Sequence, residues 1–241
     1  MSDSPPLSGR LALVTGASRG IGAATAEELA KAGAHVVLVA RTGQALEQVE
    51  ERIHDAGGAA TIAPLDLTDG TSIGKLAGAV AERWEKLDIL VLNAAMLGSL
   101  SPVQDIDPKE YARVLTLNVG ANQALIAAFD PLLKKSELAD VVGITSTVGH
   151  QPRAFWGAYG SSKAALENLL GAYADETEHT GTIRVHIVNP GPTRTRMREL
   201  AYPGEDPESV KPPEAVGEAI VERLIGDAPT GEKVRVEASA Q

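Results

Sequence analysis

The sequence predicts an α/β fold, a doubly wound parallel sheet of about seven strands with helices on both faces. Short runs rich in Val, Ile and Leu recur along the chain without polar–apolar alternation, which is typical of strands covered on both faces. Segments with apolar residues at helical spacing separate these runs. Strand and helix therefore alternate six times, as expected of right-handed βαβ units.

The individual elements follow from these runs. Strands are predicted at residues 11–15, 35–40, 60–63, 89–92, 141–145 and 185–188, with a closing edge strand at 234–236. Helical stripes begin at Ile21, Leu46, Ile73, Tyr111 and Tyr159; the third extends to Trp84, and the fourth runs past Phe129 with Pro131 inside or near its end. The first two stripes are followed by Gly33 and Gly57, which favour helix C-termini.

No linker long enough to separate a second domain is visible. Residues 1–241 are therefore expected to form one domain, with a core at 10–195, a substrate-side loop and helix at 196–230, and a last strand and tail at 231–241. The Pro- and acid-rich stretch 202–213 is either a flexible cover over a site or an ordinary solvated loop.

Composition excludes several classes of function. The 241 residues hold 22 Lys and Arg against 32 Asp and Glu, and a net charge of −10 argues against nucleic-acid binding. The chain has no Cys, which rules out disulfides and thiolate chemistry, and the five His show no metal-ligand spacing. No apolar stretch is long enough to span a membrane, and the polar N-terminus does not resemble a signal peptide, so a cytoplasmic protein is expected.

A glycine-rich turn follows the first predicted strand. Gly16, Gly20 and Gly22 lie between that strand and the start of a helix. Glycines allow a tight turn and a close approach of the backbone, and a helix N-terminus offers free N–H groups to an anion. This arrangement predicts a site for a pyrophosphate group.

A second motif lies at the start of the fifth helix. Tyr159 and Lys163 are four residues apart, so their side chains are expected on one face of the helix. A nearby ammonium favours the phenolate, and the spacing thus predicts that Lys163 lowers the pKa of Tyr159 toward the range useful for acid–base catalysis. Ser146 follows the predicted strand 141–145, at the edge of the sheet where parallel α/β proteins bind ligands.

Together these motifs resemble the short-chain dehydrogenase/reductase family, and in particular bacterial 3-oxoacyl-acyl-carrier-protein reductase-like oxidoreductases. Members carry TGxxxGxG after the first strand and a Ser thirteen residues before the Tyr of YxxxK, as 146 and 159 are here. Asn93-Ala94-Ala95 is similar to the family's NAG motif, with Ala95 in place of Gly, and Asn189-Pro190-Gly191 is similar to its PG motif. The resemblance implies a Rossmann-type fold.

The resemblance also implies roles for single residues. Ser146 would hydrogen-bond a substrate carbonyl, Tyr159 would donate or accept the proton, Lys163 would bind the nicotinamide ribose, and Asn118 would hold a water in the proton relay. The implied cofactor-binding residues are Gly16, Ser18, Arg19, Gly20, Ile21, Gly22, Arg41, Asp66, Leu67, Asn93, Ala94, Ala95, Tyr159, Lys163, Pro190, Gly191 and Thr193. No metal is implied.

The end of the second strand favours one form of the cofactor. NAD-binding folds commonly place an acidic residue there for the ribose 2′-hydroxyl, whereas this chain has Ala40-Arg41. An arginine fork suits the 2′-phosphate of NADP(H), and in the family pattern Arg19 lies on the same side. NADP(H) is therefore expected to be preferred, with NAD(H) possible, although a solvated Arg41 is the alternative.

The expected function is an NADP(H)-dependent oxidoreductase that interconverts a carbonyl and an alcohol. The alternative is a non-catalytic NADP-binding regulator or scaffold on the same fold. Family position suggests His150, Trp156, Met96 and Met197 as substrate contacts, while Trp156 would serve equally well in a core or a subunit interface. A homodimer or homotetramer is implied, assembled through the two long helices near 109–133 and 157–180, with a small-molecule substrate and neither nucleic acid nor membrane as a partner.

Overall fold

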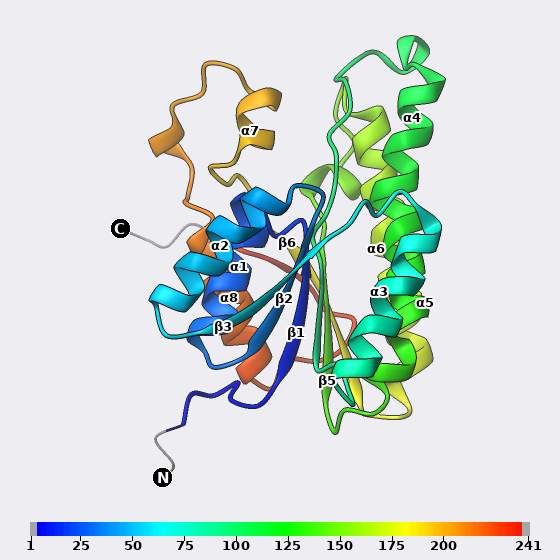
Figure 1. Ribbon diagram of the computed structural model, residues 1–241. Coiled ribbons are helices and arrows are strands. Elements are labelled where there is room, and N and C mark those ends of the chain that lie inside the picture. Colours follow the sequence, from blue (N-terminus) through cyan, green and yellow to red (C-terminus); the bar gives the residue numbers. More distant parts are fainter. Residues whose placement is uncertain (1–3, 238–241) are drawn as a thin grey trace.

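The computed structural model of the protein describes residues 4–237. Its seven strands are all parallel and lie in the order β3-β2-β1-β4-β5-β6-β7 (Figure 1). They are β1 (Leu11–Thr15), β2 (His35–Ala40), β3 (Ala59–Pro64), β4 (Ile89–Leu92), β5 (Ala139–Ile144), β6 (Ile183–Asn189) and β7 (Lys233–Arg235). This confirms the predicted fold class. The strand order reverses between β1 and β4, which marks the place where such sheets bind ligands.

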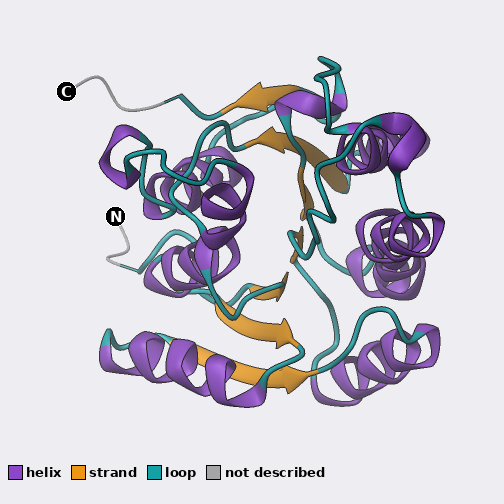
Figure 2. Cartoon of the chain, turned by 90° about the horizontal axis from the view of Figure 1, so that it is seen from above, coloured by secondary structure: helices purple, strands orange, loops and turns teal. Residues whose placement is uncertain are grey.

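Helices cover both faces of the sheet (Figure 2). One face carries α1 (Gly20–Lys31), α2 (Gly43–Asp55) and α8 (Glu214–Ile225), and the other carries α3 (Gly70–Arg83), α5 (Ala121–Leu133) and α6 (Gly157–Glu178). Two further helices, α4 (Pro108–Leu115) and α7 (Arg196–Ala201), rise beyond the sheet in Figure 1. The long segments after β4 and β6 thus extend the protein at the carboxyl edge of the sheet.

Each central strand contributes to two cores. In β1, Leu11 and Leu13 pack with α3, α5 and α6, while Ala12 and Val14 pack with α1, α2 and α8. Successive side chains of a strand point to opposite faces, so a strand buried on both sides needs apolar residues at every position. This explains why the runs show no alternation.

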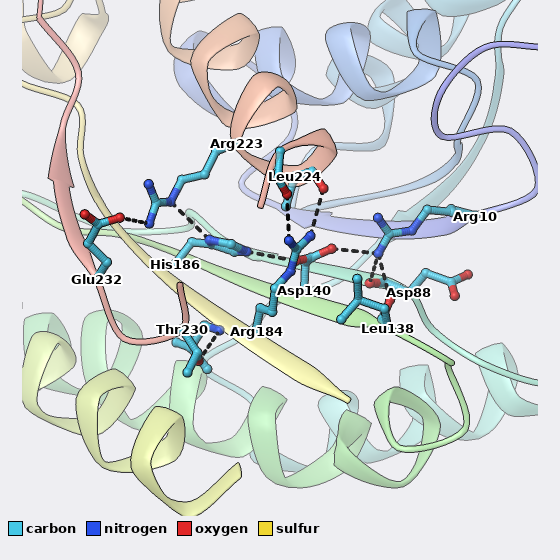
Figure 3. A network of polar contacts seen from close by, with 12 residues as sticks. Arg10, Asp88, Leu138, Asp140, Arg184, His186, Arg223, Leu224, Thr230 and Glu232 are labelled. Carbon is cyan, nitrogen blue, oxygen red and sulfur yellow. Dashed lines mark hydrogen bonds and ion pairs between the residues drawn. The ribbon is translucent and has the colours of Figure 1, made fainter. Parts of the chain in front are cut away.

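The fifth and sixth strands differ from the prediction because they contain charged residues. Strand β5 begins at Ala139 and includes Asp140, whose side chain is fully buried. Its carboxylate accepts hydrogen bonds from Arg10 at 2.7 Å, Arg184 at 2.9 Å and His186 at 2.8 Å (Figure 3). Two of these partners lie on β6, which extends from Ile183 to Asn189. The predicted strands therefore began two residues too late, at Val141 and Val185, because the charged residues near the strand starts look like surface positions in the sequence.

This network fixes the tautomer of the His186 ring. The Arg223 Nε–H donates to His186 Nδ1 at 3.1 Å, so the ring proton lies on Nε2 and is donated to Asp140 (Figure 3). Burial alone would raise the pKa of the Asp140 carboxyl, but the hydrogen bonds from His186, Arg184 and Arg10 outweigh burial and hold that pKa below its usual range. The network joins the amino ends of the strands, away from the predicted site.

Two helix predictions need correction. The fourth predicted helix is interrupted, because a π-helical turn at Thr116–Gly120 separates α4 from α5. Pro131 lies inside α5. Trp84 was expected within the third helix, but α3 ends at Arg83 and Trp84 has an extended backbone with φ −133°. Helical spacing of apolar residues does not reveal either the extra residue of a π turn or a helix end marked by no Gly or Pro.

Candidate active site

The glycine turn after β1 forms a cradle that side chains would fill. A Cβ added at Gly22 would lie 2.3 Å from the carbonyl oxygen of Gly16 and 2.4 Å from Asn93 Nδ2. Gly16 and Gly20 have φ of +65° and +56°, which L side chains rarely adopt. The helix that follows has no acidic residue in its first turn and no side chain capping its N-terminus. These features fit a pyrophosphate, which the free N–H groups would bind.

A hydrogen-bonded junction holds β1 and β4 together beside this cradle. The Thr15 hydroxyl donates to the carbonyl of Val91 at 3.0 Å and accepts from the backbone N–H groups of Asn93 and Ala94 at 3.0 and 3.1 Å. Asn93 Nδ2 donates to the carbonyl of Thr15 at 2.8 Å. Asn93 therefore shapes the cradle through the backbone, and Thr15, to which no role was assigned from the sequence, is its main partner.

Arg41 and Asp66 lie at the far side of the same edge. Arg41 is exposed and directly follows Ala40, the last residue of β2. The Asp66 carboxylate accepts from the backbone N–H and the hydroxyl of Thr68 at 2.9 and 2.7 Å. These bonds hold the pKa of Asp66 below its ordinary value, and the charge of Arg41 adds a smaller effect in the same direction. Leu67 beside them is buried, and Arg19 in the glycine turn is exposed.

The segment after β6 reaches the glycine turn from the other side. Gly191 has φ +62°, and its N–H donates to Asn189 Oδ1 at 3.0 Å. Thr193 is buried and its hydroxyl lies 3.2 Å from the carbonyls of Pro190 and Gly191. A Cβ added at Gly20 would lie 3.3 Å from a methyl group of Thr195. The structure thus brings the predicted cofactor segments after β1, β4 and β6 together.

Asn118 occupies the π-helical turn and is fully buried. Its side chain accepts from the N–H of Met96 at 2.8 Å and donates to the carbonyl of Met96 at 2.9 Å and to the Ser162 hydroxyl at 3.0 Å. A π turn projects a residue out of the regular helical positions, and such turns are frequent at functional sites. Asn118 therefore joins the segment after β4 to α6, one residue before Lys163.

Tyr159 and Lys163 lie on the buried face of α6, as predicted. Tyr159 is 8% exposed and Lys163 is 1% exposed. The Lys163 ammonium lies 5.7 Å from the centroid of the Tyr159 ring and donates to the carbonyl of Ile144, the last residue of β5, at 2.8 Å. An ammonium has three donors, so this bond leaves two for other partners.

The predicted lowering of the Tyr159 pKa is wrong for the chain by itself. Burial raises the pKa of the Tyr159 phenol, and the charge of Lys163 does not reverse this. Burial also lowers the pKa of Lys163 to about 8, while the charge of Glu167 acts in the opposite direction. The sequence argument weighed the charge of the ammonium but not the desolvation of both groups.

Ser146 follows β5 and is half-buried, at the start of the 3₁₀ turn Thr147–Gly149. This turn packs closely on α6, since a Cβ added at Gly160 would lie 2.8 Å from the carbonyl of Val148. The Lys163 bond to Ile144 reaches the same strand end, two residues before Ser146. The segment that carries Ser146 therefore packs against the helix of Tyr159 and Lys163 at the carboxyl end of β5.

The four residues predicted to contact the substrate have different surroundings in the structure. The Trp156 ring lies edge-on to the Tyr159 ring, with centroids 5.9 Å apart, and Met96 is tied to Asn118 through its backbone. Met197 lies half-buried on α7. The His150 Nδ1 lies 3.6 Å from a carboxylate oxygen of Glu167. Sequence reasoning missed Ser162 and Glu167, although both occur within four residues of Lys163 on α6.

A model of the short chain dehydrogenase family matches residues 10–206. The chain belongs to this family. This short-chain dehydrogenase is 40% identical over 210 residues to YciK, an uncharacterized oxidoreductase of Escherichia coli K12. The match covers 86% of this chain and 82% of YciK. The family resemblance predicted from the motifs is thereby confirmed.

Solved structures of other short-chain dehydrogenases share the fold over nearly the whole chain. One from Salmonella enterica serovar Typhi superposes with a TM-score of 0.92 at 36% identity, covering 99% of this chain and 100% of that protein. Another from Escherichia coli CFT073, complexed with NADPH, has a TM-score of 0.90 at 37% identity and covers 98% and 100% of the two chains. Within residues 4–237 no helix is long and apolar enough to cross a membrane, and no cluster of three acidic or His side chains suits a metal ion.

Proposed function

We propose that this protein is an NADP(H)-dependent oxidoreductase that interconverts a carbonyl and an alcohol by hydride transfer. The observation that carries the proposal is the hydrogen bond from Lys163 to the carbonyl of Ile144. It joins the helix of Tyr159 and Lys163 to the strand that leads into Ser146, and this carboxyl edge of the sheet is the edge that also carries the glycine cradle. A protein that only binds nucleotides has no need of the set Ser146, Tyr159 and Lys163.

The residues around the cradle fit a dinucleotide. Gly16, Gly20 and Gly22 would hold the pyrophosphate, and Arg41 with Arg19 would bind a 2′-phosphate through charge-assisted hydrogen bonds. We assign the other predicted cofactor contacts to the adenine side (Asp66 and Leu67), to the junction with β4 (Asn93, Ala94 and Ala95) and to the nicotinamide side (Pro190, Gly191 and Thr193). The similar E. coli protein complexed with NADPH supports this choice of cofactor.

A nicotinamide bound at this edge of the sheet would supply the hydride in reduction and accept it in oxidation. In the direction of reduction, the Ser146 hydroxyl donates a hydrogen bond to the carbonyl oxygen, and the Tyr159 phenol donates its proton to that same oxygen while the carbon gains the hydride. The product is the alcohol, and Tyr159 is left as a phenolate. Oxidation runs through the reverse steps.

Burial makes the phenolate of Tyr159 costly, so a positive charge beside it is required. We assign part of this charge to Lys163, whose ammonium lies 5.7 Å from the centroid of the Tyr159 ring in a buried site where charges are weakly screened, and the rest to the positive ring of the oxidised nicotinamide that would lie beside it. We assign to Asn118 the task of orienting the proton relay. Its bonds to Met96 and Ser162 hold it rigidly between α6 and the segment after β4.

The substrate would lie against the aromatic side of the site. Trp156 lies between the rings of Tyr159 and Tyr202, whose centroids are 5.9 and 5.8 Å from its own. Tyr202 belongs to segment 196–230, which we propose covers the substrate together with Met96 and Met197. We also propose that two or four copies assemble through α5 and α6.

An NADPH-oxidation screen against a panel of ketones and aldehydes, with cofactor binding followed by fluorescence, tests the proposal. Wild type is expected to turn over at least one carbonyl class, and Tyr159→Phe is expected to bind NADPH normally while losing turnover by about 10²-fold or more. A fully active Tyr159→Phe protein would reject the role of Tyr159. Tight NADPH binding without turnover across the panel would leave the non-catalytic alternative.

A further inference from the structure

A buried carboxylate lies one helical turn beyond Lys163. Glu167 is 4% exposed and, as the fourth residue after Lys163 on α6, shares its face of the helix. Removing a carboxylate from water costs several kcal/mol unless nearby charges and hydrogen bonds compensate. Glu167 takes no direct part in the proposed reaction. The contacts of its carboxylate therefore need to account for the presence of a buried charge at this position.

Two elements outside α6 hold the carboxylate. The Lys233 ammonium of β7 donates to Glu167 Oε2 at 3.1 Å. The second oxygen, Oε1, lies under the turn after β5, where a Cβ added at Gly149 would approach it to 3.2 Å. The same added Cβ would lie 3.2 Å from the carbonyl carbon of Lys163. One turn thus packs on Lys163 and Glu167 together.

The charged groups around this pair are few. Lys163 faces the carbonyl of Ile144 from β5 and the neutral phenol of Tyr159 from its own helix. Glu167 faces Lys233 from β7 and His150, whose Nδ1 lies 3.6 Å from Oε1. Among the described residues, Glu167 is the charged side chain that opposes the lowering of the Lys163 pKa by burial. Both Lys233 and His150 are about half-exposed, so solvent screens them more than it screens Glu167.

We propose that Glu167 is a positioning residue that acts through Lys163: its buried carboxylate, held by Lys233 one helical turn from Lys163, keeps the Lys163 side chain in the charged form that the proposed reaction needs. The inference rests on the proposed function, in which Lys163 acts as an ammonium beside Tyr159. Strand β7 then also contributes to the site, because its Lys233 provides the positive charge that offsets the cost of burying the Glu167 carboxylate.

The direct test follows the titration of Lys163 in the protein without cofactor. Side-chain NMR of ¹⁵N-lysine-labelled protein, with the Lys163 signal identified by its loss in Lys163→Met, gives the pH at which the ammonium deprotonates. Glu167→Gln is expected to move this titration to lower pH, and Glu167→Asp to move it less. Glu47→Gln, which removes the same charge from an exposed position on α2, is expected to leave it unchanged.

An unchanged Lys163 titration in Glu167→Gln would overturn the inference. Glu167→Leu fills the same space with an apolar side chain and gives the same readout if the Gln variant fails to fold. Where turnover is measurable, Glu167→Gln is expected to lose about 3- to 10-fold more activity than wild type between pH 7 and pH 9. Failure of the proposed function would instead appear as full activity of Tyr159→Phe, whatever the titration of Lys163.

Discussion

The Lys163 ammonium donates a 2.8 Å hydrogen bond to the carbonyl oxygen of Ile144, the last residue of β5. This bond couples α6 to the strand that leads into Ser146. Groups on separate elements are therefore held in one arrangement before a substrate arrives. Holding reacting groups in position in this way lowers the entropic part of a reaction barrier.

Lys163→Met is expected to abolish turnover and yet stabilise the protein near neutral pH. Burial lowers the pKa of Lys163 to about 8 from 10.5. Below pH 8 both the folded and unfolded states bind the proton, and the folded state bears the full cost of a buried ammonium. Between these pKa values the unfolded chain binds more protons, so the contribution of this group to stability rises with pH.

The advantage of Lys163→Met in unfolding free energy is therefore expected to be roughly 2–3 kcal/mol at pH 7 and to shrink toward pH 10. Chemical denaturation of both proteins at pH 7, 8.5 and 10 measures it. Lys135→Met, at an exposed position after α5, serves as the control. A difference that stays constant with pH would show that burial does not govern the titration of Lys163.

Gly22→Ala is expected to destabilise the protein by about 1–3 kcal/mol and to abolish nucleotide binding. The new methyl group would overlap the backbone carbonyl of Gly16 and the side-chain amide of Asn93, which a 2.8 Å hydrogen bond to the carbonyl of Thr15 holds in place. Gly74→Ala on α3 is the matched control, since its Cβ would meet open space and should stabilise by about 0.5–1 kcal/mol. Thermal unfolding with and without NADPH distinguishes the two variants. A Gly74→Ala protein that lost as much stability and nucleotide binding as Gly22→Ala would refute the proposed role of the glycine cradle.

Arg41→Ala is expected to weaken NADPH binding by about 10- to 100-fold, as loss of a charge-assisted contact implies, and to leave NADH binding unchanged. The reason is that Arg41 would contact the 2′-phosphate, which NADH lacks. Values of kcat/KM for both cofactors measure the effect. Arg113→Ala, at an exposed position on α4, is the control. A wild-type preference for NADH would reject the role of Arg41.

Asp140→Asn is expected to destabilise the fold by about 3–5 kcal/mol, because it leaves Arg10 and Arg184 facing a neutral amide in a buried network. The folded-state pKa of Asp140 is lowered, so its contribution is present above pH 4 and lost as the pH falls through the folded value. Chemical denaturation should show that wild type and Asp140→Asn differ less in unfolding free energy at pH 3.5 than at pH 7. Asp55→Asn, an exposed position, should show almost none.

Tyr202→Ala is expected to raise KM for the carbonyl substrate several-fold while leaving the Kd for NADPH unchanged. Its ring packs on Trp156 and on the guanidinium of Arg198, 3.6 Å from the ring centroid, and so ties segment 196–230 to the site. Tyr202→Phe keeps both packing contacts but loses the hydrogen bond from Arg153, and should stay near wild type. Steady-state kinetics compare the two, and an equal loss in both variants would contradict the packing argument.

Much of the fold was predictable because a strand that is buried on both faces needs apolar residues at nearly every position, and such runs can be recognised in the sequence. The bounds of β1, β2 and β4 were predicted to the residue, since each is an apolar run with at most one polar residue at its end. The ends of β5 and β6 were not. Asp140 and Arg184 look like surface residues until the sheet pairs them with each other and with Arg10, at a distance of 130 residues along the chain.

The candidate site was likewise predictable only in part from the sequence. Spacing alone placed Tyr159 and Lys163 on one helical face and the glycines at a helix start, because both are local consequences of helix geometry. The sequence by itself therefore determined which chemical groups this protein carries and their order along the chain. Only the tertiary structure decided that Lys163 reaches Ile144, that Glu167 is clamped by Lys233 and that His150 faces Glu167, because desolvation and long-range contacts exist only once the strands have assembled.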